Sequence, residues 1–217
     1  MKFSLSAIVL EPLSKIKPKN AVILCHGYGG DGKDISILAG YWRTYLPDTI
    51  FICPDAPEKC EASPSGFQWF DLTDQDPEQI LSKSLVAENK LNKLIDEVKE
   101  SYNLLANKII IGGFSQGSMI SLQTGIKRKD KINSILGYSG KIIDLEHLSK
   151  NIFSRPNIFL MHGDIDQVVP VDGLLEAKNF FIKNNYEIET KIFKDCEHRI
   201  PMEGSSLGLQ FIKKHLY

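Results

Sequence analysis

The sequence has no excess of charge of either sign and no long apolar run. Its formal net charge is −1, so composition offers no strongly basic surface for nucleic acid or for an anionic membrane. No apolar run approaches the roughly 18 residues that a membrane-spanning helix needs. We therefore expect neither nucleic-acid binding nor an integral membrane segment.

Sequence signs of disulfides and of secretion are also lacking. The cysteines are Cys25, Cys53, Cys60 and Cys196. They form no C-x-x-C pair, and two of them lie inside apolar runs, which favours free buried thiols in a reducing compartment over disulfides or a zinc site. The first residues show no A-x-A-like cleavage motif, and the alternation over residues 3–9 indicates a half-buried edge strand. We therefore expect a cytoplasmic protein.

What the sequence does have is an alternation of short apolar runs with amphipathic stretches. The apolar, β-branched runs predict strands at 21–25, 49–53, 108–111, 132–136, 157–161 and 187–193. The amphipathic stretches predict helices at 86–102, 116–126, 174–184 and 205–215. Strands that alternate with helices predict an α/β fold with a mostly parallel sheet covered on both faces. Without repeats or linkers, we expect one domain over residues 1–217 and no separate cap domain.

A candidate nucleophile follows the run at 108–111. Residues 113–117 fit the pattern G-x-S-x-G, with Ser115 at its centre. A serine in such a strand–turn–helix unit is lifted off the carboxyl edge of the sheet, where the helix N-terminus favours negative charge. Glycines flank it because side chains would clash in the strained turn. Ser115 is the predicted nucleophile; the alternative is a glycine-rich turn in which Ser115 only caps the helix.

A serine nucleophile needs a base, and the chain has five histidines that could supply it. In this kind of fold the order is Ser, Asp, His, each beyond the carboxyl end of a strand. His198 fits, since it follows the strand predicted at 187–193 and precedes the last helix. His26 and His162 each end a strand and precede glycine, which is typical of structural histidines bonded to loop backbone. His147 and His215 lie in charged stretches.

The base in turn needs an orienting acid, and two carboxylates, Asp164 and Asp166, follow the run at 157–161. Asp164 can be explained as a turn former, because Asp side chains bond backbone two residues on. The order of the triad favours Asp166.

The oxyanion of an acyl-transfer reaction needs two backbone N–H groups aimed at one point. One comes from the residue after the nucleophile and the other from the loop after an early strand. The glycine-rich loop after 21–25 therefore nominates Tyr28, together with Gln116 after the serine. Glycines beside Tyr28 let backbone approach a substrate closely.

The same glycine-rich loop also fits the dinucleotide-binding pattern G-x-G-x-x-G, with Asp55 as the acidic residue beyond it. This would make the protein an oxidoreductase. However, His26 and Asp31 would crowd a pyrophosphate, and Ser115 and His198 would have no role.

One loop carries an unusual set of aromatic residues. Residues 54–76 are rich in Pro, Gly, Ser and Asp, yet they contain Phe67, Trp69 and Phe70. Long loops in compact domains are often functional. We expect Trp69 and Phe70 to contact the acyl part of a substrate; alternatively, the aromatic residues only anchor the loop to the core.

Together, these motifs resemble the acyl-protein thioesterase, carboxylesterase and lysophospholipase family. They run in the family's order from about residue 20 to the C-terminus. The matching stretches are His26-Gly27-x-Gly29, Cys53-Pro54-x-Ala56-Pro57, Trp69-Phe70-Asp71, Gly112-Gly113-Phe114-Ser115-Gln116-Gly117, His162-Gly163-Asp164-x-Asp166-x-x-Val169-Pro170 and His198. The chain departs from the family's usual pattern at Gly30, Ser118 and Arg199.

The resemblance implies a single-domain α/β-hydrolase fold and a serine hydrolase that cleaves carboxylic esters or thioesters. Carried over, the family's triad is Ser115, Asp166 and His198. No cofactor and no metal is implied. The substrate would be a small-molecule, lipid or acyl-protein ester, and the sequence leaves the choice among them and the oligomeric state open. The alternative outside enzymes is an α/β binding module that keeps the scaffold without turnover.

Overall fold

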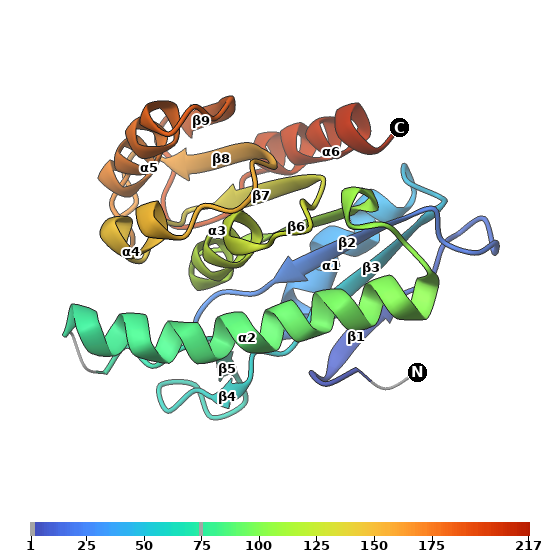
Figure 1. Ribbon diagram of the computed structural model, residues 1–217, viewed down its shortest axis with the longest axis horizontal. Coiled ribbons are helices and arrows are strands. Elements are labelled where there is room, and N and C mark those ends of the chain that lie inside the picture. Colours follow the sequence, from blue (N-terminus) through green and yellow to red (C-terminus); the bar gives the residue numbers. More distant parts are fainter. Residues whose placement is uncertain (1–2, 74–75) are drawn as a thin grey trace.

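A seven-stranded sheet forms the centre of the computed structural model, which describes residues 3–73 and 76–217 (Figure 1). Its strands are β1 (Ala7–Leu10), β2 (Asn20–Cys25), β3 (Thr49–Pro54), β6 (Ile109–Phe114), β7 (Ser134–Tyr138), β8 (Asn157–Gly163) and β9 (Ile188–Phe193). Their order across the sheet is β1-β3-β2-β6-β7-β8-β9. Strand β1 pairs antiparallel with β3, and the other neighbours are parallel. The predicted mostly parallel sheet is confirmed.

Helices cover both faces of this sheet. They are α1 (Gly32–Arg43), α2 (Pro77–Tyr102), α3 (Gln116–Lys127), α4 (Leu145–Lys150), α5 (Asp172–Lys183) and α6 (Met202–Leu216), with a 3₁₀ turn, η1 (Ala106–Lys108). One buried apolar cluster joins the sheet to α2, α3 and α5, and a second joins it to α1 and α6. No helix within the described residues is long and apolar enough to cross a membrane.

Several elements were not predicted from the sequence. Helices α1 and α4 occupy stretches without a predicted helix, and the 54–76 loop contains a short hairpin of β4 (Glu58–Lys59) and β5 (Phe67–Gln68). Helix α2 also begins earlier than predicted, because Asp76 caps its N-terminus and Pro77 suits its first turn. Because the helix starts this early, its N-terminal end lies at the carboxyl edge of the sheet.

The carboxyl edge collects the loops that carry the predicted site residues. Since β2, β6, β8 and β9 are parallel, the loops that follow them all emerge at this edge. They hold Tyr28, Ser115, Asp166 and His198, in that order along the chain. The fold therefore places four distant segments at one edge.

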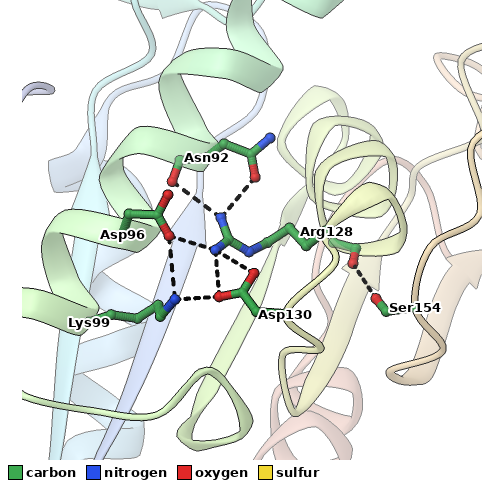
Figure 2. A network of polar contacts seen from close by, with 7 residues as sticks. Asn92, Asp96, Lys99, Arg128, Asp130 and Ser154 are labelled. Carbon is green, nitrogen blue, oxygen red and sulfur yellow. Dashed lines mark hydrogen bonds and ion pairs between the residues drawn. The ribbon is translucent and has the colours of Figure 1, made fainter.

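A charged network fastens the C-terminal half of α2 to the segment after α3 (Figure 2). Arg128, which is 7% exposed, donates to Asn92 Oδ1 at 2.9 Å and to Asp96 Oδ1 at 2.6 Å. It also pairs with Asp130 at 2.7 Å, and Lys99 contacts both carboxylates. The network holds the long helix whose other end borders the site.

Candidate active site

Ser115 lies at a sharp turn between β6 and α3. Its φ of 54° and ψ of −119° fall outside the regions that a residue with a side chain prefers. A Cβ on Gly113 would lie 2.2 Å from the Cys25 carbonyl oxygen, and a Cβ on Gly117 would lie 2.1 Å from the same atom. Both flanking glycines are therefore required, because the turn is pressed against the end of β2.

His198 lies beside this turn and pairs with Asp166. Its Nδ1 atom is 2.7 Å from Asp166 Oδ2, and its ring lies 4.7 Å from that of Phe114, the residue before the serine. The other carboxylate oxygen, Oδ1, accepts hydrogen bonds of 2.9 Å from the N–H groups of Val168 and Val169. Burial alone would raise the pKa of Asp166, but the bonds from His198 and the two N–H groups outweigh it and lower that pKa.

A second histidine contacts the same carboxylate. His162 Nε2 lies 3.3 Å from Asp166 Oδ2 and 2.7 Å from the Val169 carbonyl oxygen. Both neighbours are acceptors, so Nε2 carries the proton. Burial lowers the pKa of His162, which keeps the ring neutral. The backbone bond confirms the sequence interpretation of His162; its approach to Asp166 was not predicted.

Asp164 does not reach His198. Its Oδ1 atom accepts from the Cys196 N–H at 3.2 Å, and its own N–H donates to the Phe193 carbonyl at 3.0 Å. Asp164 therefore braces the loop between β9 and α6, a longer-range contact than the local turn we expected. Of the two candidate acids, the structure brings Asp166 to the imidazole.

The two nominated oxyanion donors flank the serine. The N–H of Gln116 is the first of α3, so the helix itself supplies no acceptor for it. In the loop after β2, the Gly29 N–H donates to Phe67 and the Gly30 N–H to Gly27. Within the described residues the Tyr28 N–H has no hydrogen-bond partner.

The loop after β2 also lies directly against the serine. A Cβ on Gly27 would lie 3.4 Å from the Ser115 Cβ. The Tyr28 hydroxyl is hydrogen-bonded to Cys60, which raises its pKa to about 12, so it stays a neutral phenol. The backbone of Tyr28 is therefore held near Ser115 by a close-packed glycine on one side.

The aromatic residues of the 54–76 loop are held by the Gln116 side chain. Its Oε1 accepts from the Trp69 N–H at 2.8 Å, and its Nε2 donates to the Phe70 carbonyl at 2.6 Å. The Trp69 indole is fully buried and donates to the His26 carbonyl at 3.0 Å. This placement favours the anchoring alternative for Trp69, because a buried ring cannot meet a substrate.

The dinucleotide alternative is not supported by the contacts around Asp55. Its Oδ1 atom accepts from the Gly32 N–H at 2.9 Å at the start of α1. A Cβ on Gly32 would lie 2.2 Å from the Cys53 carbonyl, so this glycine serves helix–strand packing. His26 has the structural role expected of it: its Nδ1 donates to Gly27 at 2.7 Å, and its Nε2 accepts from Ala56 at 2.9 Å.

Comparison with known proteins assigns this arrangement to a family. A family profile described as Phospholipase/Carboxylesterase matches residues 8–217. The acyl-protein thioesterase 1 of Saccharomyces cerevisiae is 34% identical, over 95% of this chain and 98% of the yeast protein. The chain belongs to the phospholipase/carboxylesterase family. It is therefore a serine hydrolase of carboxylic esters or thioesters.

Solved structures give the same assignment for the fold. The crystal structure of esterase PE8 aligns with a TM-score of 0.93 at 34% identity, covering 98% of this chain and 99% of that one. The acyl-protein thioesterase 2 of Zea mays aligns with a TM-score of 0.79 at 21% identity, covering 98% and 99%. The α/β-hydrolase fold predicted from the sequence is confirmed.

A cavity opens at Ser115. It has a volume of about 450 Å³, and most of the residues that line it are apolar. Its lining residues are Tyr28, Phe70, Leu72, Pro77, Ile80, Ser115, Gln116, Met119, Lys141, Ile143, Val168 and Val169. Phe70, a predicted substrate contact, is among them, but only 1% of it is exposed, so the anchoring alternative applies to Phe70 as well as to Trp69. Most of the others were not predicted, because they are scattered over several elements and, apart from Val169, stand in none of the quoted motifs.

Ser118 shows how the esterase accommodates one departure from its family. A Cβ on Gly137 would lie 2.3 Å from the Ser118 Oγ, and a Cβ on Gly140 would lie 2.5 Å from it. The hydroxyl thus occupies space that two neighbouring glycines leave open.

Proposed function

We propose that Ser115, His198 and Asp166 form a catalytic triad that hydrolyses esters through an acyl-enzyme. Ser115 Oγ attacks the substrate carbonyl, and His198 takes its proton. Because His198 Nδ1 lies 2.7 Å from Asp166, Nδ1 keeps its proton and Nε2 acts as the base. The imidazole then returns the proton to the leaving alcohol or thiol. Water repeats the same steps on the acyl-enzyme.

The contact between His198 and Asp166, next to the strained Ser115 turn, is the observation that carries this proposal. The carboxylate is fully buried, and three hydrogen bonds from His198 and two N–H groups fix its position. An acid held this rigidly orients the imidazole and stabilises the imidazolium that forms during turnover. A binding module without turnover would have no need of it.

The N–H groups of Tyr28 and Gln116 would stabilise the oxyanion. Such donors act on charge that develops only in the transition state, so removing one costs about 10²–10³ in kcat. The Gln116 side chain also hydrogen-bonds the backbone of Trp69 and Phe70, so the residue that supplies this N–H group is joined to the 54–76 loop. We infer that the 54–76 loop supports the oxyanion site and the cavity at once.

The apolar cavity at Ser115 supports a substrate with an aliphatic acyl chain. Each buried CH₂ contributes about 0.8 kcal/mol, so the cavity should favour medium chains over acetate. The name of the yeast relative, acyl-protein thioesterase 1, makes an S-acylated protein one candidate substrate. A small soluble ester and a lysophospholipid are the others that the resemblance implies.

We further propose that the protein works in the cytoplasm. All four cysteines are free and buried, in keeping with a reducing compartment. Expression of a fluorescent fusion in the source cell, followed by fractionation, tests this.

Labelling with a fluorophosphonate probe, combined with turnover of p-nitrophenyl butyrate, tests the triad. We expect labelling at Ser115, and Ser115→Ala should lower kcat by about 10⁶ and abolish labelling. Ser118→Ala is the matched control, since its hydroxyl is buried one helical turn away. Unchanged labelling or turnover in Ser115→Ala would refute the proposal. Thioester, ester and lysophospholipid substrates, compared by kcat/KM, then separate the three substrate classes.

A further inference from the structure

A second cavity lies at His198, separate from the one at Ser115. It has a volume of about 370 Å³, and Tyr28 borders both cavities. It continues into a groove of about 430 Å³ between α1 and the start of α6. The cavity and the groove share Asp34, Ile35 and Ile200, so they form one continuous depression. We call this depression the α1–α6 groove.

The chemistry of the triad decides which part of the substrate faces this groove. The imidazole must return its proton to the leaving oxygen or sulfur, so the leaving group departs on the side of His198. The acyl group then lies on the other side, in the apolar cavity that Ser115 and Gln116 border. The two depressions therefore correspond to the two halves of an ester.

We propose that the α1–α6 groove binds the alcohol or thiol half of the substrate and selects an uncharged, apolar one. This rests on the triad assigned under the proposed function. Leu38, Tyr41 and Met202 line the outer part of the groove, and Tyr41 and Met202 are 55% and 88% exposed. Apolar side chains this exposed gain free energy when an apolar group covers them.

The charges near the groove support an uncharged occupant. Asp34 and Arg199, one of each sign, are the charged side chains that line it, beside His198, the neutral His26 and the phenols of Tyr28 and Tyr41. The pKa of His26 is lowered by burial, so it adds no positive charge at neutral pH. A phosphorylated head group would need a surplus of cations or backbone donors at this place. The groove therefore fits an apolar alcohol or thiol better than the glycerophosphate part of a lysophospholipid.

Esters with a constant acyl group and a varied alcohol test this inference. Ethyl, butyl and hexyl butyrate place the same chain in the acyl cavity while the alcohol grows by CH₂ groups. We expect kcat/KM to rise about tenfold from the ethyl to the hexyl ester, as an apolar subsite discriminates between homologues. A lysophospholipid with a phosphocholine head group should show no comparable rise in kcat/KM.

Three variants in the groove and one control elsewhere connect the effect to the groove. Met202→Asp and Tyr41→Asp should bring the hexyl-to-ethyl ratio of kcat/KM close to one. Met202 is the first residue of α6, where an aspartate is compatible with the helix, and Met202→Leu should keep the ratio. Leu105→Asp is the matched control, because Leu105 is 71% exposed and precedes β6 at the opposite edge of the sheet.

The outcomes separate this inference from the triad proposal. Two results would overturn the groove assignment while Ser115-dependent turnover persists. One is a wild-type kcat/KM that does not change from the ethyl to the hexyl ester, and the other is a hexyl-to-ethyl ratio that neither Asp substitution changes. Turnover that survives in Ser115→Ala overturns the triad instead. If Leu105→Asp lowers the hexyl-to-ethyl ratio as much as Met202→Asp does, this result would also contradict the groove assignment.

Discussion

The Nε2 atom of His162 lies 3.3 Å from the Oδ2 atom of Asp166, the same oxygen that His198 contacts. The carboxylate thus sits between two imidazoles, one buried and one open to the cavity beside it. Since His162 also bonds the Val169 carbonyl, it joins the acid to the loop that supplies its other hydrogen bonds. We regard His162 as a positioning residue for Asp166.

The first prediction removes this contact. His162→Phe leaves the Val169 carbonyl without its donor, which should lower the free energy of unfolding by about 1–3 kcal/mol. It should also lower kcat about tenfold, because the carboxylate loses one of the groups that define its position. Urea unfolding and kcat for a butyrate ester measure the two effects. His162→Asn, which can still donate, should recover part of kcat; a stability loss with unchanged kcat would show that His162 only supports the fold.

The second prediction distinguishes the two aspartates. Asp166→Asn should lower kcat about 10⁴-fold, as when the acid of a serine triad is neutralised. Asp164→Asn should cost much less, since Asp164 contacts the Cys196 N–H and not the imidazole. Both variants change one carboxylate to an isosteric amide in the same loop, so each controls for the other. A reversed ranking would assign the acid to Asp164.

The third prediction concerns the acyl cavity and its anchor. Trp69→Ala should lower the free energy of unfolding by about 3–5 kcal/mol and reduce turnover of acetate and octanoate esters equally. Ile80→Asp places a charge in the cavity wall, so it should reduce octanoate turnover about tenfold more than acetate turnover. Measuring kcat/KM for both esters and the melting temperature separates the two roles. A selective octanoate loss in Trp69→Ala would restore Trp69 as a substrate contact.

The fourth prediction follows from the buried histidines. Burial lowers the pKa values of His26 and His162 below 6.5 in the folded protein. Below about pH 6.5 the unfolded chain therefore binds more protons than the folded one, so the free energy of unfolding falls as the pH is lowered. Above about pH 6.5 both rings are neutral in the folded and the unfolded chain, so they contribute no further change in stability with pH. Asp166, whose pKa is lowered from 3.8, adds a further loss only at about pH 4 and below.

Urea unfolding at about pH 8, 6.5 and 5.5 checks this fourth prediction. The midpoint should move little between the two higher values and then drop, with the slope m unchanged. A midpoint that stays constant down to pH 5.5 would mean that both rings titrate with the same pKa in the folded and the unfolded chain, so that burial does not lower it.

Sequence patterns predicted that Ser115, Asp166 and His198 each follow a strand, and the structure has each of them in the loop or turn after β6, β8 or β9. Parallel strands bring such positions to one edge, so Ser115, Asp166 and His198 could be grouped before any coordinates. The contact between His162 and Asp166 could not be predicted in this way. It depends on which way two buried rings turn, and periodicity contains no information on that.

Local composition also obscured some elements. The glycines before α1 indicated a turn and gave no sign that Asp31 caps a twelve-residue helix directly afterwards. The aromatic residues of the 54–76 loop suggested a binding surface, yet Trp69 is buried by contacts with Gln116 and His26. Such contacts join residues more than 40 positions apart, and a single sequence does not reveal them.

The burial of all four thiols has a practical consequence for labelling. Burial raises the pKa of Cys25 to about 12 and that of Cys53 further, so neither forms the thiolate that alkylating reagents attack at neutral pH. Cys60 and Cys196 are buried as well, which shields them from reagents. A cysteine introduced at the exposed Met202 would therefore accept a spin label or fluorophore ahead of the native thiols. The label would respond to molecules that enter the α1–α6 groove, and the native cysteines would not have to be removed first.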